Sequence, residues 1–481
     1  MKFTHILVGY SCLLLLGCQS KSANFNPESK TSSSYAAVWD YRPEQNTSPV
    51  ETIEFDKTSL PSLTQLIDIG LNNNPNTKLA WQQAKAQAVQ LALARQGFYP
   101  SATLNGNFTR LRKSDFPSDD GVFYETQYGP TLSLSYTLFD FGATKYQSLS
   151  QEKILVAMNL SHNAMIQQVI QTVKNNYFDL VYQQELLKAN KEDLYDAFAN
   201  FEVAKTKYRV GVASFLDFVQ SKAQYLSSKS TFENQKANVD ASFYNLALGI
   251  GIPNLKKFKL PNFEDNALTQ TTLQDVNRLI TIAKNLRPDV QSYMAQVQAQ
   301  QALIKQKRAD RFPKLQGSFD IGKTWYGNGE HDKYHFTAQI NLNIPLFEGF
   351  GLINKERAAK QALNIAKTQL VEIEQQITNE VLTLHTAVKN AAKQLEFAKE
   401  ILSTQKVSYD IAIAKYKNGT TSILELLTAF TNLADARANV VLAKKMWYLN
   451  LTNLAKATGI LTNSLNTGAP IFKTVKNETQ K

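Results

Sequence analysis

The chain has 481 residues, of which 43% are hydrophobic and 19% are charged, and its formal net charge is +11. No stretch approaches the roughly 20 consecutive apolar residues of a membrane-spanning helix, so any membrane contact must use an anchor, an amphipathic surface or a β-barrel. Basic residues are scattered among acidic and amide side chains rather than gathered with aromatics, which predicts a solvated helical surface and no nucleic-acid partner.

Residues 1–17 have the pattern of a lipoprotein signal peptide. Lys2 precedes a short apolar core, too short to span a bilayer. The core ends in Leu-Leu-Gly-Cys18, which resembles a bacterial lipobox, and Cys18 is therefore the expected lipidation site. By the same resemblance, Gln19 favours the outer membrane, and residues 18–59 form an anchor and extended segment. A plain signal peptide with an incidental cysteine is the alternative.

The rest of the chain repeats itself, at an offset of 208 residues over most of each repeat and of 213 residues for Pro75 and Pro100, which return as Pro288 and Pro313. Tyr-Arg-Val-Gly211 returns as Tyr-Lys-Asn-Gly419, and Leu-Phe-Asp140 returns as Leu-Phe-Glu348. Chance similarity between Ala-rich helices does not keep glycines and prolines in register over two halves. The repeat predicts four segments: repeat 1 over 60–253, an equatorial linker over 254–271, repeat 2 over 272–460, and a polar tail over 461–481.

Each repeat begins with short helices and contains one very long helix followed by a returning helix. The segments 143–210 and 352–418 contain no Gly and no Pro, the residues that break helices. Apolar residues in the second segment recur at steps of three and four, the heptad pattern of coiled-coil packing. We expect long helices over about 142–207 and 351–416, each about 100 Å long, and returning helices over about 213–248 and 421–457.

Four strands precede the long helices, over about 101–113, 124–138, 314–326 and 334–346. Apolar and polar residues alternate along each strand, as in membrane barrels and also in half-buried soluble sheets. Aromatic residues toward the hairpin ends indicate a membrane interface girdle and, with the anchor, favour the barrel. Four strands cannot close a barrel, so the chain must oligomerise, as a dimer with 8 strands or a trimer with 12.

Together these motifs resemble the TolC-like outer-membrane efflux family, and most closely its lipoprotein branch. The resemblance rests on the lipobox, the tandem repeat, the Leu-Phe-acid motifs and the paired Tyr-x-x-Gly turns, and it covers about residues 60–460. It implies a mainly α fold with transmembrane β. In that fold, a trimeric 12-strand outer-membrane β-barrel is continuous with a long periplasmic α-helical coiled-coil barrel, with four strands and two helical hairpins per chain.

The same resemblance implies a function and partners. The chain would be a lipid-anchored outer-membrane channel that extends into the periplasm, the exit duct of a tripartite multidrug efflux or type I secretion system. Small molecules or polypeptides would reach it from a periplasmic adaptor (a membrane fusion protein) and an inner-membrane pump of the RND or ABC type. The sequence does not decide between these cargoes or pumps.

The resemblance places the two Tyr-x-x-Gly turns at a periplasmic tip where the adaptor docks. The expected docking residues are Tyr208, Arg209, Val210 and Gly211 in repeat 1, and Tyr416, Lys417 and Gly419 in repeat 2. The expected gate residues are Asp217, Leu424, Glu425 and Thr428. Three leucines around a trimer axis exclude water, and three carboxylates select cations. Here the chain departs from its relatives, because Thr428 stands where the lipoprotein branch has an Asp and Thr421 where some members have an Arg.

Nothing in the sequence indicates catalysis. It has no Walker loop, no nucleophile elbow and no His-Glu-x-x-His helix. His331 and His335 fall on an expected loop and strand, where a polar loop is a better interpretation than a metal site. Cys12 and Cys18 lie in or at the end of the signal, which leaves no thiol pair for a disulfide or metal. We expect no enzyme, metal or cofactor. A periplasmic coiled-coil scaffold is the main rival, although it would not need four strands.

Overall fold

The computed structural model describes residues 27–39, 62–114, 122–253, 257–258, 260–263, 272–273, 275–327, 333–461 and 472–473. The expected signal peptide and the Cys18 lipidation site lie outside these residues. The same is true of most of the anchor segment, most of the equatorial linker and most of the polar tail. The chain divides into two compact units. Unit 1 comprises Met1–Thr31, Gln82–Asn159 and Ser292–Leu370, and unit 2 comprises Ser32–Trp81, Leu160–Gln291 and Val371–Lys481.

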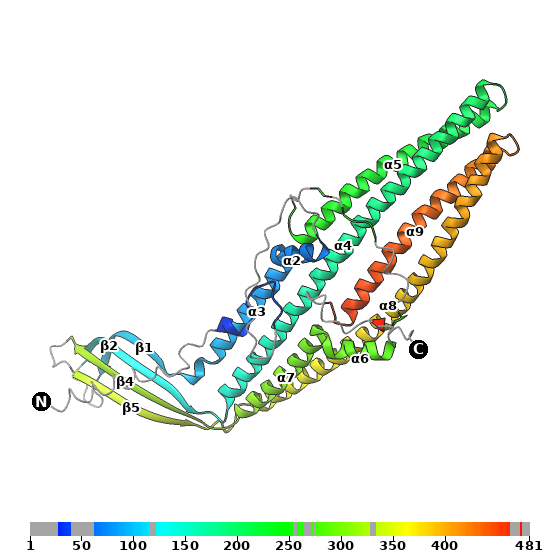
Figure 1. Cartoon of the computed structure of the whole chain (residues 1–481). Helices are drawn as coiled ribbons and strands as arrows, with labels where there is room; N and C mark the ends of the chain where they lie inside the picture. The colour runs from blue at the N-terminus through cyan, green and yellow to red at the C-terminus, as the bar shows by residue number, and fades with distance from the viewer. Residues whose placement is uncertain are drawn as a thin grey trace. The chain divides into compact units, whose positions relative to one another are not determined.

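Unit 1 contains a four-stranded antiparallel sheet in the order β1-β2-β4-β5 (Figure 1). Its strands are β1 (Ser101–Ser114), β2 (Val122–Phe139), β4 (Lys314–Tyr326) and β5 (Lys333–Asn343). Strand β5 ends short of the expected 346 because Pro345 has no backbone N–H to donate to a ladder. Within the described residues, β1 and β5 each pair on one side only, so they are the edges of the sheet.

Large apolar side chains of the sheet are exposed in the single chain, among them Leu104, Phe108, Phe336 and Ile340. Tyr128 stacks on Trp325 from the neighbouring strand, with ring centroids 5.6 Å apart. An outward apolar band with aromatic side chains is typical of strands that face lipid.

Asp140 holds the corner between β2 and the long helix α4 (Ala143–Arg209). Its carboxylate accepts hydrogen bonds from the N–H groups of Gly142 at 2.9 Å and Thr144 at 2.7 Å. The chain turns at Phe141 and Gly142, which have φ of 54° and 86°. The Leu-Phe-Asp motif of repeat 1 is therefore a strand-to-helix corner with a carboxylate cap.

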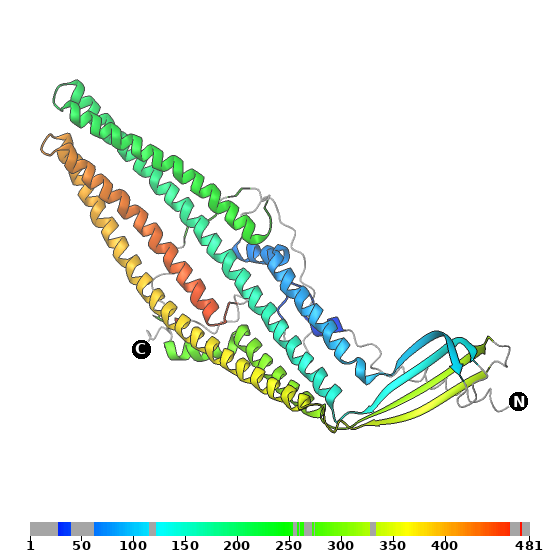
Figure 2. The same ribbon diagram turned by 180° about the vertical axis from the view of Figure 1, so that it is seen from behind.

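Helix α4 and its repeat-2 counterpart α8 (Gly351–Lys417) each have 67 residues. Helices α5 (Phe215–Ile250) and α9 (Ile423–Ala457) return beside them, as both views show (Figures 1 and 2). None of the described helices combines the length and apolarity that a membrane crossing requires. The shorter elements are η1 (Pro27–Lys30), α2 (Leu63–Asn73), α3 (Pro75–Ala94), η2 (Gln96–Phe98), β3 (Thr272–Leu273), α6 (Val276–Leu286), α7 (Pro288–Ala309) and β6 (Phe472–Lys473).

The core of unit 2 has two parts. One cluster lies where α2, α4 and α5 meet, and it includes Leu66, Leu71, Ile166, Ile170, Leu246 and Ile250. A second cluster joins the hairpins of the two repeats, and it includes Ala197, Ala204, Tyr409, Tyr416, Phe430 and Leu433. Because the second cluster draws on α4, α8 and α9, the first hairpin packs directly against the second hairpin of the same chain.

Candidate functional site

The two hairpin turns share one backbone geometry. Gly211 and Gly419 have φ of 81° and 76°, in the left-handed region that favours glycine. The residue after each glycine donates its N–H back to the helix: Val212 to the Lys207 carbonyl at 2.9 Å, and Thr420 to the Lys415 carbonyl at 3.0 Å. These are Schellman bonds, which end α4 and α8 at equivalent positions.

Asp217 and Glu425, two of the expected gate residues, lie in the first turns of the returning helices, which are capped by Ser214 and Ser422. The Ser214 hydroxyl accepts the Asp217 N–H at 3.1 Å, and the Ser422 hydroxyl accepts the Glu425 N–H at 3.3 Å. Hydroxyls donate to both carboxylates, from Ser214 to Asp217 at 2.6 Å and from Thr421 to Glu425. A carboxylate in the first helical turn interacts favourably with the helix dipole, so both acids have a local structural role.

Most of the residues expected to dock an adaptor are exposed, but Tyr416 is not. Arg209, Val210 and Lys417 face solvent, and Tyr208 is 42% exposed, whereas Tyr416 is 3% exposed. A buried side chain cannot offer its surface to a partner, so Tyr416 supports the tip from inside. Docking at the other positions stays a prediction.

The remaining gate positions lie on the first turns of α9. Leu424 is 64% exposed in the single chain, and Glu425 and Thr428 are exposed as well. The Thr428 hydroxyl donates to the Leu424 carbonyl at 2.8 Å. The hydroxyl of Thr428 is thus used within its own helix, and its part in a gate stays a prediction.

Lys207 of the first hairpin contacts Tyr416 of the second. Its Nζ donates to the Tyr416 carbonyl at 2.5 Å and lies 4.9 Å from the centroid of the Tyr416 ring, within cation–π range. Burial and the nearby Asp217 carboxylate raise the pKa of Tyr416 to about 12. The phenol therefore stays neutral, and Lys207 of the first hairpin holds the ring and the backbone carbonyl of Tyr416. Lys207 is not among the docking residues expected from the sequence, although the same lysine recurs as Lys415 in repeat 2.

Farther along the hairpins, ion pairs join α9 to α4. Arg437 lies 2.5 Å from the Asp193 carboxylate and 2.9 Å from that of Asp196, and Lys445 lies 2.5 Å from Asp179. The seam between the two hairpins of one chain is thus ionic along part of its length. These partners belong to different repeats, and the sequence pattern alone did not identify them.

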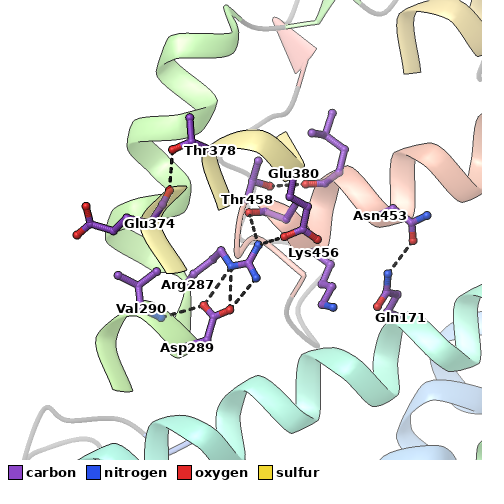
Figure 3. A network of polar contacts seen from close by, with 12 residues as sticks. Gln171, Arg287, Asp289, Val290, Glu374, Thr378, Glu380, Asn453, Lys456 and Thr458 are labelled. Carbon is purple, nitrogen blue, oxygen red and sulfur yellow. Dashed lines mark hydrogen bonds and ion pairs between the residues drawn. The ribbon is translucent and has the colours of Figure 1, made fainter. Parts of the chain in front are cut away.

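Near the far end of α9, Arg287 anchors a polar network (Figure 3). Its side chain is 9% exposed, and its guanidinium donates to Asp289 at 2.7 Å, to Glu380 at 2.5 Å and to the Ala457 carbonyl at 3.2 Å. The network ties the start of α7 to α8 and to the end of α9. The available sequence signal was the position of Arg287 directly before Pro288, which begins α7.

Within the part of the chain that the structure describes, no group of three or more His, Cys, Asp or Glu side chains could hold a metal ion. His335 lies in β5, and His331 is outside the described residues. The hairpin tips combine packed aromatic side chains, such as Tyr416, with exposed ones, such as Tyr208.

Comparison with known proteins adds independent findings. A sequence model of the family described as outer membrane efflux protein matches residues 66–251 and 279–460. The chain is 26% identical to a probable efflux pump outer membrane protein, TtgC of Pseudomonas putida, over 83% of each chain. It is 25% identical to nodulation protein T of Rhizobium leguminosarum bv. trifolii, over 80% of this chain and 83% of the relative.

Among solved structures, the chain resembles the CmeC outer membrane channel of Campylobacter jejuni. The TM-score is 0.72 at 20% identity, and the match covers 82% of this chain and 85% of the other. The expected fold class, with four strands and two long helical hairpins per chain, is confirmed. The two segments that match the family model fall within the two sequence repeats, one in each.

Proposed function

Because this chain belongs to the outer membrane efflux protein family, we propose that it is the outer-membrane channel subunit, or exit duct, of a tripartite efflux or type I secretion system. The observation that carries this proposal is the pairing, in one chain, of a sheet with an exposed apolar face and two hairpins built on 67-residue helices. The apolar strands suit lipid, and helices about 100 Å long suit a duct through the periplasm. No catalytic step is proposed.

Three copies form one channel. The sheet of a single copy ends at β1 and β5, and each unpaired backbone group in lipid costs several kcal/mol. Closing the sheet with a neighbouring copy on each side removes that cost. A dimer would give a barrel of about eight strands, whose interior its own side chains fill, whereas a trimer with about 12 strands leaves room for an aqueous passage.

The hairpin tips dock a periplasmic adaptor, which connects the channel to an inner-membrane pump of the RND or ABC type. Support comes from the exposed positions around the turns, Tyr208, Arg209 and Val210 in repeat 1 and Lys417 in repeat 2. The rigid Schellman turns at Gly211 and Gly419 present these side chains in the same way in both repeats. The relative from Pseudomonas putida is an efflux pump component by name, which favours an efflux system over a type I secretion system.

A gate lies behind the tips. Three copies of Leu424 around the axis would form a ring that excludes water, with Glu425 and Asp217 adding carboxylates that attract cations. Thr428 extends the same helical face by one turn. Exposure of Leu424 and Glu425 in the single chain supports this arrangement, because axis-facing side chains contact only other copies.

The chain is anchored by acylation of Cys18, which retains it at the outer membrane. Each buried methylene of an acyl chain contributes about 0.8 kcal/mol to membrane binding. The lipobox pattern in the sequence supports this step.

The proposal is tested by reconstitution. Protein purified from the outer-membrane fraction should run as a heat-modifiable trimer and should give discrete conductance steps in planar lipid bilayers. A Cys18→Ala variant serves as the control, since it should lose its acyl anchor but keep its pores. If that variant is recovered as a soluble periplasmic protein and neither form makes pores, the chain is a periplasmic scaffold and the channel proposal is wrong.

A further inference from the structure

The contact between Lys207 and Tyr416 links the two repeats in one direction only. Each repeat ends its long helix with a Lys-Tyr pair, Lys207-Tyr208 in repeat 1 and Lys415-Tyr416 in repeat 2. Within the chain, the lysine of repeat 1 binds the tyrosine of repeat 2. The reciprocal contact, from the lysine of repeat 2 to the tyrosine of repeat 1, is not made among the described residues.

Both residues of the reciprocal pair are available. Lys415 is exposed, and in the described part of the chain its ammonium makes no hydrogen bond, ion pair or ring contact. Tyr208 stacks on Phe218 at a centroid distance of 5.6 Å and contacts Phe215 at 5.7 Å, yet it remains 42% exposed. Its counterpart Tyr416 is 3% exposed because the first hairpin covers it. The greater exposure of Tyr208 is expected if the hairpin that covers it belongs to a neighbouring copy of the chain.

The long helices show the same asymmetry farther from the tip. Asp193 of α4 is 8% exposed and lies under Arg437 of the second hairpin, whereas its repeat-2 equivalent, Ile401 of α8, is 52% exposed. Ile401 and Phe397 line a groove of about 500 Å³ between α8 and α9. Ile401 and Lys415 lie about four helical turns apart on α8, so the groove and Lys415 face the same side of that helix. Among the described residues, nothing covers Lys415 or Ile401.

We propose that this surface is covered by a second copy of the chain, with Lys415 of one copy contacting the Tyr208 ring of its neighbour. The inference rests on the proposed function, which supplies the neighbouring copy. In a closed ring of copies, repeat 2 of each copy is followed by repeat 1 of the next. The packing of repeat 1 against repeat 2 within a chain is therefore repeated between repeat 2 of one chain and repeat 1 of the next. The Lys-Tyr contact then recurs at every seam between hairpins.

The two kinds of seam then differ in chemistry. The seam within a chain combines the Lys-Tyr contact with ion pairs of Arg437. The seam between chains combines the same contact with the groove at Ile401, whose lining residues carry no charge. Lys415 thus gives the apolar seam its oriented polar contact at the tip, which fixes the register of neighbouring hairpins.

Crosslinking tests the proposal in the full-length protein. The double variant Tyr208→Cys/Lys415→Cys is treated with a short bis-maleimide in membranes, and the product is boiled in SDS. A ladder up to covalent trimers is expected, while each single variant should give none. The control Lys207→Cys/Tyr416→Cys should crosslink within one chain and give no ladder.

The outcomes separate this inference from the proposed function. If unboiled samples show trimers but the first double variant gives no ladder, the Lys415–Tyr208 contact is wrong and the channel proposal stands. If no trimers form even in the parent protein, both fall. A product that is crosslinked only within the monomer would also overturn the contact.

A second measurement covers the case in which the cysteine variants fold poorly. The temperature at which trimers dissociate in SDS should fall for Lys415→Glu and for Tyr208→Leu, and should stay close to that of the parent for Tyr208→Phe, which keeps the ring. Lys417→Glu makes the same charge change at an exposed neighbour and is the matched control. Equal dissociation temperatures for Lys415→Glu and Lys417→Glu would overturn the proposal.

Discussion

Asn74 donates a hydrogen bond of 2.9 Å from its side-chain amide to the carbonyl oxygen of Gly249, near the end of α5. The equivalent bond in repeat 2 runs from the Arg287 guanidinium to the Ala457 carbonyl, at 3.2 Å. Both donors stand directly before a proline that begins a helix. The hydrogen bond to the end of the returning helix is therefore made by a neutral amide in repeat 1 and by a charged guanidinium in repeat 2.

We expect Arg287→Ala to lower the free energy of unfolding by on the order of 2 kcal/mol, because it leaves a carbonyl and two carboxylates without their buried donor. Asn74→Ala should cost about 1 kcal/mol, the typical value of one neutral hydrogen bond. Thermal denaturation followed by circular dichroism measures both. Lys205→Ala is the control, because the side chains of Lys205 and Glu202 are both exposed and 3.0 Å apart, and such pairs contribute about 0–1 kcal/mol. Equal losses for Arg287→Ala and Lys205→Ala would contradict the prediction.

Gly211→Ala should destabilise the first hairpin turn by about 1 kcal/mol, since an L-residue is strained at its φ of 81°. No atom lies within 4 Å of an added Cβ, so the effect is one of backbone conformation alone. Faster hydrogen exchange of the amides around the turn would report the change. Gly351→Ala is the control, because Gly351 has equal space around it and does not have positive φ. Unchanged exchange in Gly211→Ala would show that the turn tolerates strain.

The lowered pKa of Glu356 should make the stability of the protein depend on pH in the acidic range. Hydrogen bonds from Lys360 and Arg311 lower its pKa from 4.5 to about 2. A carboxylate with a lowered pKa in the folded state contributes its stability above the unfolded pKa, and that contribution is lost as the pH falls through about 2. The difference in melting temperature between the parent and Glu356→Gln should therefore be constant at neutral pH and shrink below about 4.5.

The control for that titration is Glu233→Gln, which removes an exposed carboxylate 2.9 Å from Lys236 on a single helix. Its effect should be small at every pH. The prediction is wrong if the difference in melting temperature between the parent and Glu356→Gln stays constant down to pH 2. That result would show that Lys360, Arg311 and Arg308 do not keep the Glu356 carboxylate ionised.

Leu424→Ala should raise the resting conductance of reconstituted channels, because a smaller ring at the axis admits water. Leu216→Ala is a matched control, since Leu216 is the repeat-1 equivalent and is similarly exposed, at 61% against 64%. Single-channel recording in planar bilayers compares the two. A gate at Leu424 is ruled out if neither substitution alters conductance, and the assignment moves to repeat 1 if only Leu216→Ala does.

Much of the fold could be predicted from the sequence because its strongest signals are local. The absence of Gly and Pro marks α4 and α8, and glycines at the turns mark their ends. Pro345 is an equally local signal for the end of β5, and the expected bound of 346 lies beyond it. The alternation in the strands predicted the sheet, although it did not by itself distinguish a membrane sheet from a soluble one.

The contacts between elements could not be predicted in the same way. A heptad pattern shows which face of a helix is buried, but not which helix covers it. Lys207, Arg287 and Arg437 each contact at least one partner from a distant part of the chain, so their roles needed the structure. Asp217 is an intermediate case. The sequence contains the Ser-x-x-acid pattern that places Asp217 in a helix turn capped by Ser214, whereas the family resemblance implies only a gate role for it.

The edge strands β1 and β5 have a consequence for biogenesis. Within the described residues, each is paired along one side only, so an isolated copy carries two rows of unsatisfied N–H and C=O groups. Moving such a copy alone into hydrocarbon is strongly uphill. Copies must therefore meet before or during insertion, and the rate of channel formation should rise more steeply than linearly with the concentration of newly exported subunits.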